Sequence, residues 1–314
     1  MAKLGECFSV IRNGASIRQT DGAGGFPITR IETIADKTIN REKFGYAGIY
    51  DLAQYRDYIL QDGDILMSHI NSEKHLGKVA LYSKQDDEQI IHGMNLLMLR
   101  ADTQKVIPEY AKYYFESQKF LRQIGRITKK SVNQASFTVT ALKELEIPLA
   151  SIIVQRDISE KLKKVDWLVS LRKQQLAKLD ELVKARFVEM FGDPKDNRSN
   201  LVKIGEIGDL TSGGTPSRSN SEYFNGSIRW YSAGELNSLY LPDSIEHISR
   251  TALSQSAAKL FEKGTLMIGM YDTAAFKMGI LTEQSSSNQA CANLKPTEQY
   301  SVIWLYYLFD IMKP

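Results

Sequence analysis

The sequence predicts a mixed α/β protein in which two copies of one domain are joined by a long α-helix. Two observations predict this arrangement. Short motifs recur in the same order about 200 residues apart, and the stretch between the copies carries a heptad pattern of apolar residues. The length of 314 residues also suits two typical domains.

The composition is that of an ordinary globular protein without a strong charge bias. Hydrophobic residues make up 43%, charged residues 25%, and the net charge is +3. A DNA-facing surface would therefore have to be local. The two cysteines, Cys7 and Cys291, indicate a reducing compartment without disulfides. No apolar run approaches the ~20 residues that cross a bilayer, and the N-terminus has no signal-peptide core, so we expect a cytoplasmic protein without membrane contact.

Five motif pairs define the repeat. In chain order they are residues 4–6 with 204–206, 28 with 228, 63–67 with 264–268, 77–79 with 279–281, and 113–115 with 306–308. Unrelated strand-turn-strand segments also share glycines, but they do not preserve this order. A period near 200 residues is too long for a solenoid, so the pairs indicate two copies of one domain.

Residues 156–191, between the copies, contain no Gly or Pro and follow a helical heptad pattern. The apolar seam consists of Ile158, Leu162, Val165, Val169, Leu176, Leu179, Val183 and Met190. Arg172 and Arg186 interrupt it, and Gly192 and Pro194 end it. The pattern predicts a helix of about five heptads, roughly 50 Å long, whose seam requires a partner helix.

These segments resemble the specificity subunits of Type I restriction–modification enzymes. Residues 179–194 resemble the end of that family's long helix, and residues 147–149 with 155–158 resemble its entry. Residues 211–217 and 223–230 resemble the start of a target-recognition domain. The order of domain, long helix and domain is also the layout of the family.

The resemblance implies a non-catalytic reader of a two-part DNA sequence. It places a first target-recognition domain at 1–150, a long spacer helix at 151–194, and a second target-recognition domain at 195–314. The helix would set the spacing of the two half-sites and bind modification subunits, which methylate adenine; restriction subunits would cleave the DNA. Complete members carry a second long helix after the second domain, so we expect that helix to be absent here and the second domain to be C-terminally truncated.

The sequence contains no motif that indicates catalysis. It lacks a Walker phosphate loop, an Asn/Asp-Pro-Pro-aromatic motif and a Glu-x-Lys triplet. His69 and His75 have no matching carboxylates or cysteines, so no metal site is expected. We therefore expect neither an enzyme nor a cofactor.

Polar and basic segments of the first copy are the candidate contacts to double-stranded DNA. Lys and Arg bind phosphates and guanine, whereas Asn and Gln pair with adenine edges. The candidates are Arg12, Asn13, Arg18, His69, Asn71, Lys74, His75, Lys78, Lys129, Lys130, Asn133 and Gln134. Solvated surface loops share this composition, and for any single residue that alternative has equal weight. Lys129 and Lys130 are the strongest candidates.

The second copy supplies a smaller set of candidates, which are Ser217, Arg218, Asn220, Tyr271 and Lys277. Ser217 could equally cap a local turn. Tyr223, Phe224 and Trp230 are expected to pack in a core, because bases stay stacked in duplex recognition.

Two alternatives remain open at this point. A truncated chain could act only as a scaffold for the modification subunit. It could also dimerise through the helix seam, so that two first domains read a palindromic bipartite site.

Overall fold

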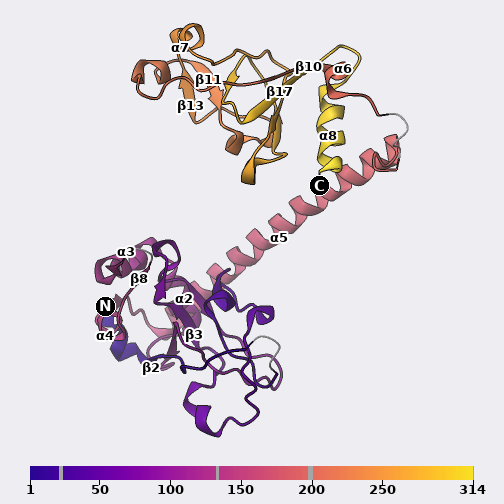
Figure 1. Ribbon diagram of the computed structural model, residues 1–314. Coiled ribbons are helices and arrows are strands. Elements are labelled where there is room, and N and C mark those ends of the chain that lie inside the picture. The colour runs from indigo at the N-terminus through magenta and orange to yellow at the C-terminus, as the bar shows by residue number, and fades with distance from the viewer. Residues whose placement is uncertain (21–23, 132–133, 197–200, 314) are drawn as a thin grey trace. The chain divides into compact units, whose positions relative to one another are not determined.

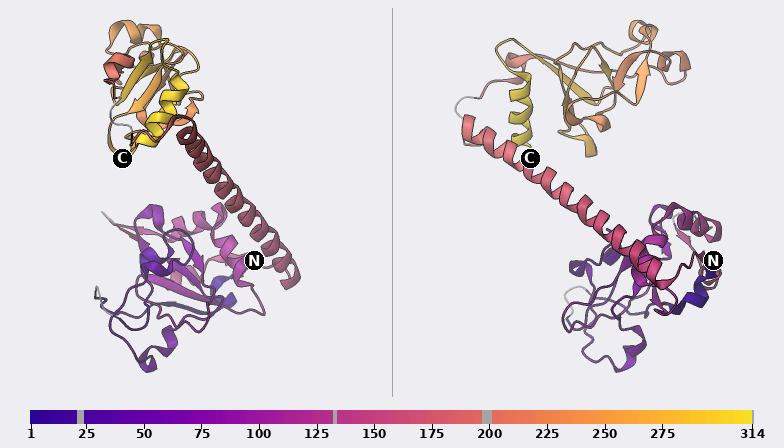
Figure 2. Two further views of the ribbon diagram at one scale, coloured as in Figure 1. Left: turned by 90° about the vertical axis from the view of Figure 1, so that its right-hand side faces the viewer. Right: turned by 180° about the vertical axis from the view of Figure 1, so that it is seen from behind.

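The computed structural model describes residues 1–20, 24–131, 134–196 and 201–313 (Figure 1). The chain forms two compact units, Met1–Arg172 (unit 1) and Lys173–Pro314 (unit 2). Their boundary falls inside helix α5 (Ile152–Phe191), whose 40 residues form one continuous helix in both views of Figure 2. No helix in the described part of the chain is long and apolar enough to span a membrane.

Before α5, the described residues of unit 1 form short strands and four short α-helices. Its strands are β1 (Ala2–Lys3), β2 (Phe8–Asn13), β3 (Ile65–Ser68), β4 (Ile70–Asn71), β5 (Val79–Leu81), β6 (Leu96–Ala101), β7 (Lys129–Lys130), β8 (Ala135–Ser136) and β9 (Glu146–Ile147). Its short helices are α1 (Leu4–Cys7), α2 (Pro108–Phe115), α3 (Gln118–Ile127) and α4 (Val139–Lys143).

The main sheet of unit 1 is antiparallel, with the strand order β2-β6-β3-β5. All four residues of β3 are buried, and its three apolar residues alternate between two apolar clusters. Ile65 and Met67 pack in the cluster that contains Phe115 and Phe120, whereas Leu66 packs in the one that contains Tyr82. Both faces of the sheet are therefore covered, because neighbouring side chains of a strand point to opposite faces.

Two smaller sheets complete unit 1. Strand β1 pairs with β9, so that Ala2 lies opposite Ile147 and the first strand of unit 1 meets the last strand before α5. Strands β4, β8 and β7 form a three-stranded sheet, in which Ile70 lies opposite Ser136 and Lys129 also lies opposite Ser136.

The start of α5 is fixed to unit 1 by a buried glutamine. The Gln155 side chain is fully buried. Its Oε1 accepts a hydrogen bond from the backbone N–H of Ile107 at 2.9 Å, and its Nε2 donates to the carbonyls of Lys105 and Ala150, both at 2.9 Å. The helix ends at Gly192, which has φ +80° and donates its N–H to the Val188 carbonyl at 2.8 Å.

Unit 2 repeats the sheet of unit 1. Its elements after α5 are α6 (Ile204–Ile207), β10 (Gly208–Ser212), β11 (Ile228–Tyr231), β12 (Asn237–Tyr240), β13 (Glu246–Ile248), α7 (Arg250–Gln255), β14 (Leu266–Gly269), β15 (Met278–Ile280), β16 (Ser286–Ser287), β17 (Cys291–Pro296) and α8 (Val302–Met312). The order β10-β17-β14-β15 matches β2-β6-β3-β5, and β12 extends the sheet. As predicted, Trp230 is buried and Tyr223 and Phe224 pack against it.

One predicted motif pair is wrong in register. Residues 77–79 were matched with 279–281, but the N–H of Gly77 and that of Phe276 make the equivalent bonds, to Ser68 and Gly269. The loop from Ser68 to Gly77 is two residues longer than the loop from Gly269 to Phe276, and the extra length in unit 1 accommodates β4. The position of Gly77 is occupied by Phe276 in the second copy, which adopts the left-handed conformation there at φ +58°, so the glycine does not mark the equivalent residue.

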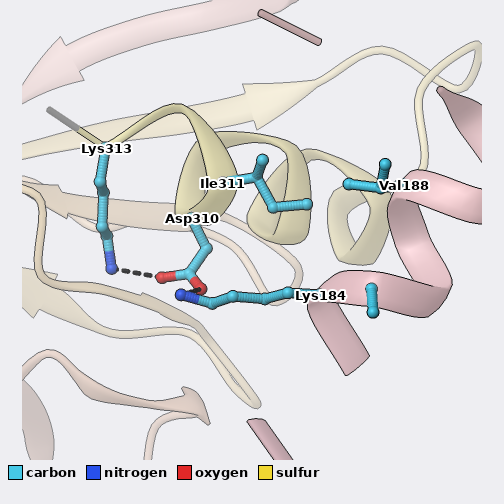
Figure 3. Close-up of a pocket in the computed structure, with 6 residues that line it drawn as sticks. Lys184, Val188, Asp310, Ile311 and Lys313 are labelled. Carbon is cyan, nitrogen blue, oxygen red and sulfur yellow. Dashed lines mark hydrogen bonds and ion pairs between the residues drawn. The ribbon is translucent and has the colours of Figure 1, made fainter. Parts of the chain in front are cut away.

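Helix α8 packs against the last turns of α5 within unit 2. The ring centroid of the buried Phe187 lies 6.0 Å from that of Trp304 and 6.5 Å from that of Tyr307. Figure 3 shows Lys184 and Lys313 converging on Asp310, with Lys184 Nζ 3.0 Å from the carboxylate. Ala185, Val188 and Ile311 complete the lining of this shallow pocket.

Candidate nucleic-acid interface

The loops that hold most of the predicted DNA contacts leave unit 1 at one end of its main sheet. Asn13, at the end of β2, lies opposite Leu97, and Ser68, at the end of β3, lies opposite Leu96. The segments after β2 and after β3 therefore emerge at the same end of the sheet, on either side of β6. We call this end the loop edge of unit 1.

The small sheet brings a second predicted segment to the loop that follows β3. Strand β4 belongs to that loop and pairs with β8, and β8 pairs with β7, which consists of Lys129 and Lys130. Lys130 Nζ lies 2.7 Å from a carboxylate oxygen of Glu73 in the same loop. Two segments that are about sixty residues apart in the sequence thus form one local structure.

The predicted DNA-contacting residues differ in exposure. The exposed ones are Asn13, Arg18, Lys74, Lys129, Lys130, Gln134, Ser217, Arg218 and Tyr271. The half-buried ones are Arg12, Asn71, His75, Lys78, Asn220 and Lys277. His69 is buried, and Asn133 lies outside the described residues.

Several of the predicted side chains are held by contacts within the protein. The Arg12 guanidinium lies 4.4 Å from the Tyr58 ring centroid and donates to the Asp57 carbonyl at 3.2 Å. Lys78 Nζ donates to the Ala35 carbonyl at 2.9 Å. Such contacts fix the direction of a long side chain, although they also reduce its freedom to reach a ligand.

His69 lies beneath the loop edge instead of on its surface. Its side chain is 5% exposed, and its ring meets that of Phe137 edge-on, with 6.2 Å between centroids. Burial lowers its pKa to about 4. We therefore leave His69 out of the proposed DNA surface, because the hairpin residue Phe137 covers it.

His92 lies below the same edge and is fully buried. Its Nδ1 is 3.4 Å from the Thr29 hydroxyl, and burial lowers its pKa to about 3. Within the described ranges, His92 Nε2 and His69 Nδ1 have no hydrogen-bond partner. The two rings are thus held neutral inside the domain, and protonating either one is costly.

Unit 2 has a loop edge in the equivalent place. Ser212 lies opposite Ala292 and Gly269 opposite Cys291, so the segments that carry Ser217 and Tyr271 leave the sheet at the same end. No counterpart of α3, β7 and β8 is present among residues 201–313. The two loop edges therefore belong to sheets with the same strand order, but the segments around the two sheets differ.

Arg218 is the most constrained of the predicted residues in unit 2. It makes two parallel bonds to the Glu246 carboxylate, at 2.8 and 2.9 Å, and lies 4.9 Å from the Phe224 ring centroid. Glu246 raises the pKa of Arg218 further, so the guanidinium stays charged. Ser217 shares a 2.8 Å hydrogen bond with Ser219, and the Asn220 side chain caps a short 3-10 helix.

The helix seam is largely exposed. Leu162, Val165, Val169, Leu176, Leu179, Val183 and Met190 have exposed fractions between 38% and 63%. Ile158 alone packs against the core of unit 1. Seven of the eight predicted seam residues are therefore available to a partner helix.

Sequence reasoning missed a set of cations on α3. Lys119, Arg122 and Arg126 are exposed and follow one another at steps of three and four residues. That spacing was visible in the sequence and is typical of one helix face. No group of three or more His, Cys, Asp or Glu side chains within the described ranges could hold a metal ion.

Comparison with known families identifies what kind of protein carries these two edges. A family model for the Type I restriction modification DNA specificity domain matches residues 1–181 and 197–313. The chain belongs to this family. This match confirms the predicted family, and the strands and helices described above confirm the mixed α/β fold class.

The matches to individual relatives cover only part of each relative's length. The chain is 40% identical over 210 residues to the putative type I restriction enzyme MjaX specificity subunit of Methanocaldococcus jannaschii, which is 65% of this chain and 48% of the relative. It is 21% identical over 186 residues to the EcoKI specificity subunit of Escherichia coli, which is 58% of this chain and 40% of the relative. The matches thus span about half of these curated relatives.

Solved structures show the same fold. The S subunit of the Type-I restriction-modification system from M. genitalium superposes with a TM-score of 0.53 at 14% identity, over 99% of this chain and 77% of that one. A chain from a structure of a type I R-M system gives a TM-score of 0.53 at 17% identity, over 100% of this chain and 79% of that one.

Proposed function

We propose that this chain recognises a two-part DNA sequence within a type I restriction–modification complex. Residues 1–150 and 195–314 would be the two target-recognition domains, and residues 151–194 the spacer helix. The observation that carries the proposal is the repeated loop edge. Both units send polar segments out of the same end of the same sheet, as expected for two readers of two half-sites.

The loop edge of unit 1 is suited to the major groove of DNA. Lys74 and Lys129 are exposed cations that could reach phosphates, and Gln134, at the end of the hairpin, could pair with an adenine edge. The β7–β8 hairpin and the loop after β3 form one small sheet, so their side chains would act together. The modification subunit would then flip an adenine out of the duplex and methylate it, and restriction subunits would cleave unmodified DNA.

In this proposal the seam of α5 binds a partner. Leu176 and Leu179 are 63% and 56% exposed, and an apolar stripe of this length is costly to leave in water. The proposed occupant is a helix of the assembled complex, next to the modification subunits. The proposed location is the cytoplasm, where such a complex meets DNA.

The exposed seam also favours a second candidate, a homodimer that joins two copies of unit 1. Such a dimer would read a palindromic bipartite site, because a twofold axis repeats the same half-site. A chain that remains monomeric at micromolar concentration, measured by analytical ultracentrifugation, would exclude this form.

Methylome sequencing tests the proposed function. Cells carrying this chain with its modification subunit are compared with cells that lack only this chain. A new bipartite methylated motif supports the proposal, an asymmetric motif indicates that both units read DNA, and a palindromic motif favours the dimer. If no motif appears while the modification subunit is present and bound, the chain is a scaffold and the proposal fails.

A further inference from the structure

Helix α3 of unit 1 presents three cations on one exposed face. Lys119, Arg122 and Arg126 are exposed, whereas Phe120 and Ile124 on the other side of the helix are buried in the core. At about 100° per residue, the three cations fall within roughly 60° of arc. We call them the α3 stripe.

The stripe lies in the most basic segment of unit 1. Residues 117–143 contain no Asp or Glu and six basic residues, which are Lys119, Arg122, Arg126, Lys129, Lys130 and Lys143. The whole chain has 40 basic and 37 acidic residues, so this segment departs sharply from the balance elsewhere. A local excess of this kind produces a positive surface potential that the net charge of +3 conceals.

The fold itself makes no use of the three charges. Among the described residues, no stripe side chain has a hydrogen-bond or ion-pair partner. Other lysines of unit 1 are paired, such as Lys3 with Glu144 at 2.6 Å and Lys112 with Glu116 at 2.9 Å. Because the stripe stabilises nothing within the protein, its charges remain available for an external anion.

Gly125 keeps the backbone of this face accessible. It is exposed, and a β-carbon added to it would meet nothing within 4 Å. A glycine inside a helix costs about 1 kcal/mol relative to alanine, and neither packing nor backbone conformation requires it here. Its absence of a side chain allows a ligand to approach the helix closely beside Arg122 and Arg126.

The stripe leads directly to the hairpin that is proposed to read bases. Helix α3 ends at Ile127, and β7 begins two residues later with Lys129. From residue 119 to residue 126 the helix rises about 10 Å at 1.5 Å per residue. Along the axis of B-DNA, where the phosphates of one strand follow one another every 3.4 Å, this length corresponds to about three phosphates.

We infer that Lys119, Arg122 and Arg126 bind the phosphate backbone of duplex DNA and dock unit 1 on it. The inference rests on the proposed function and adds a site that is separate from base readout. The stripe supplies affinity independent of sequence, and the hairpin beyond it is thereby held at the groove.

The test measures how DNA affinity depends on salt. The full chain with its modification subunits is titrated by fluorescence anisotropy, between 50 and 200 mM KCl, onto a duplex with the methylated motif and onto one without it. The variant R122A/R126A removes two stripe charges, and alanine preserves the helix. The matched control K43A/K84A removes two exposed lysines outside the α3 stripe, of which Lys84 follows β5 at the end of the main sheet opposite the loop edge.

The variant R122A/R126A should weaken binding to both duplexes and leave the motif unchanged. Each lost phosphate contact reduces the slope of log affinity against log salt by about 0.9, so two reduce it by about 1.8. Across this fourfold salt range, the wild type should then lose about tenfold more affinity than the variant.

Each other outcome overturns the inference. An unchanged slope means that the stripe does not touch phosphates. An equal loss in K43A/K84A means that only the overall charge matters, and a loss confined to the motif duplex means that the two arginines read bases. Failure of the proposed function is distinguishable, because the wild type would then show no preference between the two duplexes while the salt slope could still be compared.

Discussion

Acid should destabilise unit 1 through its two buried histidines. Burial lowers the pKa of His92 to about 3 and that of His69 to about 4, whereas both titrate near 6.5 in an unfolded chain. As pH falls below 6.5, the unfolded chain binds a proton at each ring and the folded chain does not. The free energy of unfolding therefore falls by about 1.4 kcal/mol per histidine per pH unit. From pH 7 to pH 5 the pair should remove about 4 kcal/mol.

The assay is urea unfolding at pH 7 and at pH 5. Hydrogen exchange of the β3 and β6 amides serves as the readout, because these amides report on unit 1 alone. The double variant H69Q/H92Q replaces both rings with side chains that do not titrate. Its stability at pH 7 will be lower, but the difference between the two pH values should nearly vanish. Carboxylates contribute little in this window; Arg41, for example, holds the pKa of Glu88 at about 2.

Two results would refute the reasoning. The wild-type unfolding free energy could be equal at pH 7 and pH 5, in which case the rings are not desolvated. Alternatively, the double variant could lose as much stability as the wild type, in which case other groups cause the acid sensitivity.

Four further substitutions test the packing and the backbone conformation. Gln155→Ala should lower the unfolding free energy of unit 1 by about 2–3 kcal/mol, because it leaves buried backbone groups unpaired; the exposed Arg156→Ala is the control, and an equal loss in both would contradict the role of the glutamine. Phe187→Ala should cost unit 2 about 3 kcal/mol by opening a cavity beside α8, and a loss below about 1 kcal/mol in urea unfolding would show that the two helices are not packed. Gly77→Ala should cost unit 1 about 1 kcal/mol because its φ is +74°. Phe276→Gly should change the unfolding free energy of unit 2 by less than about 0.5 kcal/mol, since the relief of backbone strain offsets the greater chain entropy of glycine in the unfolded state. If calorimetry shows a larger loss for Phe276→Gly than for Gly77→Ala, the two positions are not equivalent.

The sequence predicts the repeat and the long helix well, because both are periodic signals. It predicts single side chains less well. His69 follows a strand in a polar loop, and nothing local indicates that Phe137, nearly seventy residues later, covers its ring. Burial of this kind depends on long-range strand pairing, here of Ile70 with Ser136.

The opposite error occurred on α3. Arg122 was visible as part of a helical spacing, but only the buried positions of Phe120 and Ile124 define which face is exposed. The mismatch of Gly77 with Gly279 has a similar origin. Loop length, not residue identity, decides which residue occupies the left-handed position, and the two-residue difference is hidden because Gly77 ends the first loop while Gly279 follows the second loop, in β15.

The pairing of β1 with β9 has a consequence for how such a protein can change its target. Ala2 lies opposite Ile147, so the proposed first target-recognition domain begins and ends at neighbouring positions. The segment between Lys3 and Glu146 therefore begins and ends at neighbouring positions, and it also contacts the start of α5 through Gln155. Under the proposed function, genetic exchange of that segment would replace the DNA sequence that is read and leave α5 unchanged, as long as the new segment again offers Gln155 the backbone groups that Ile107 and Lys105 supply.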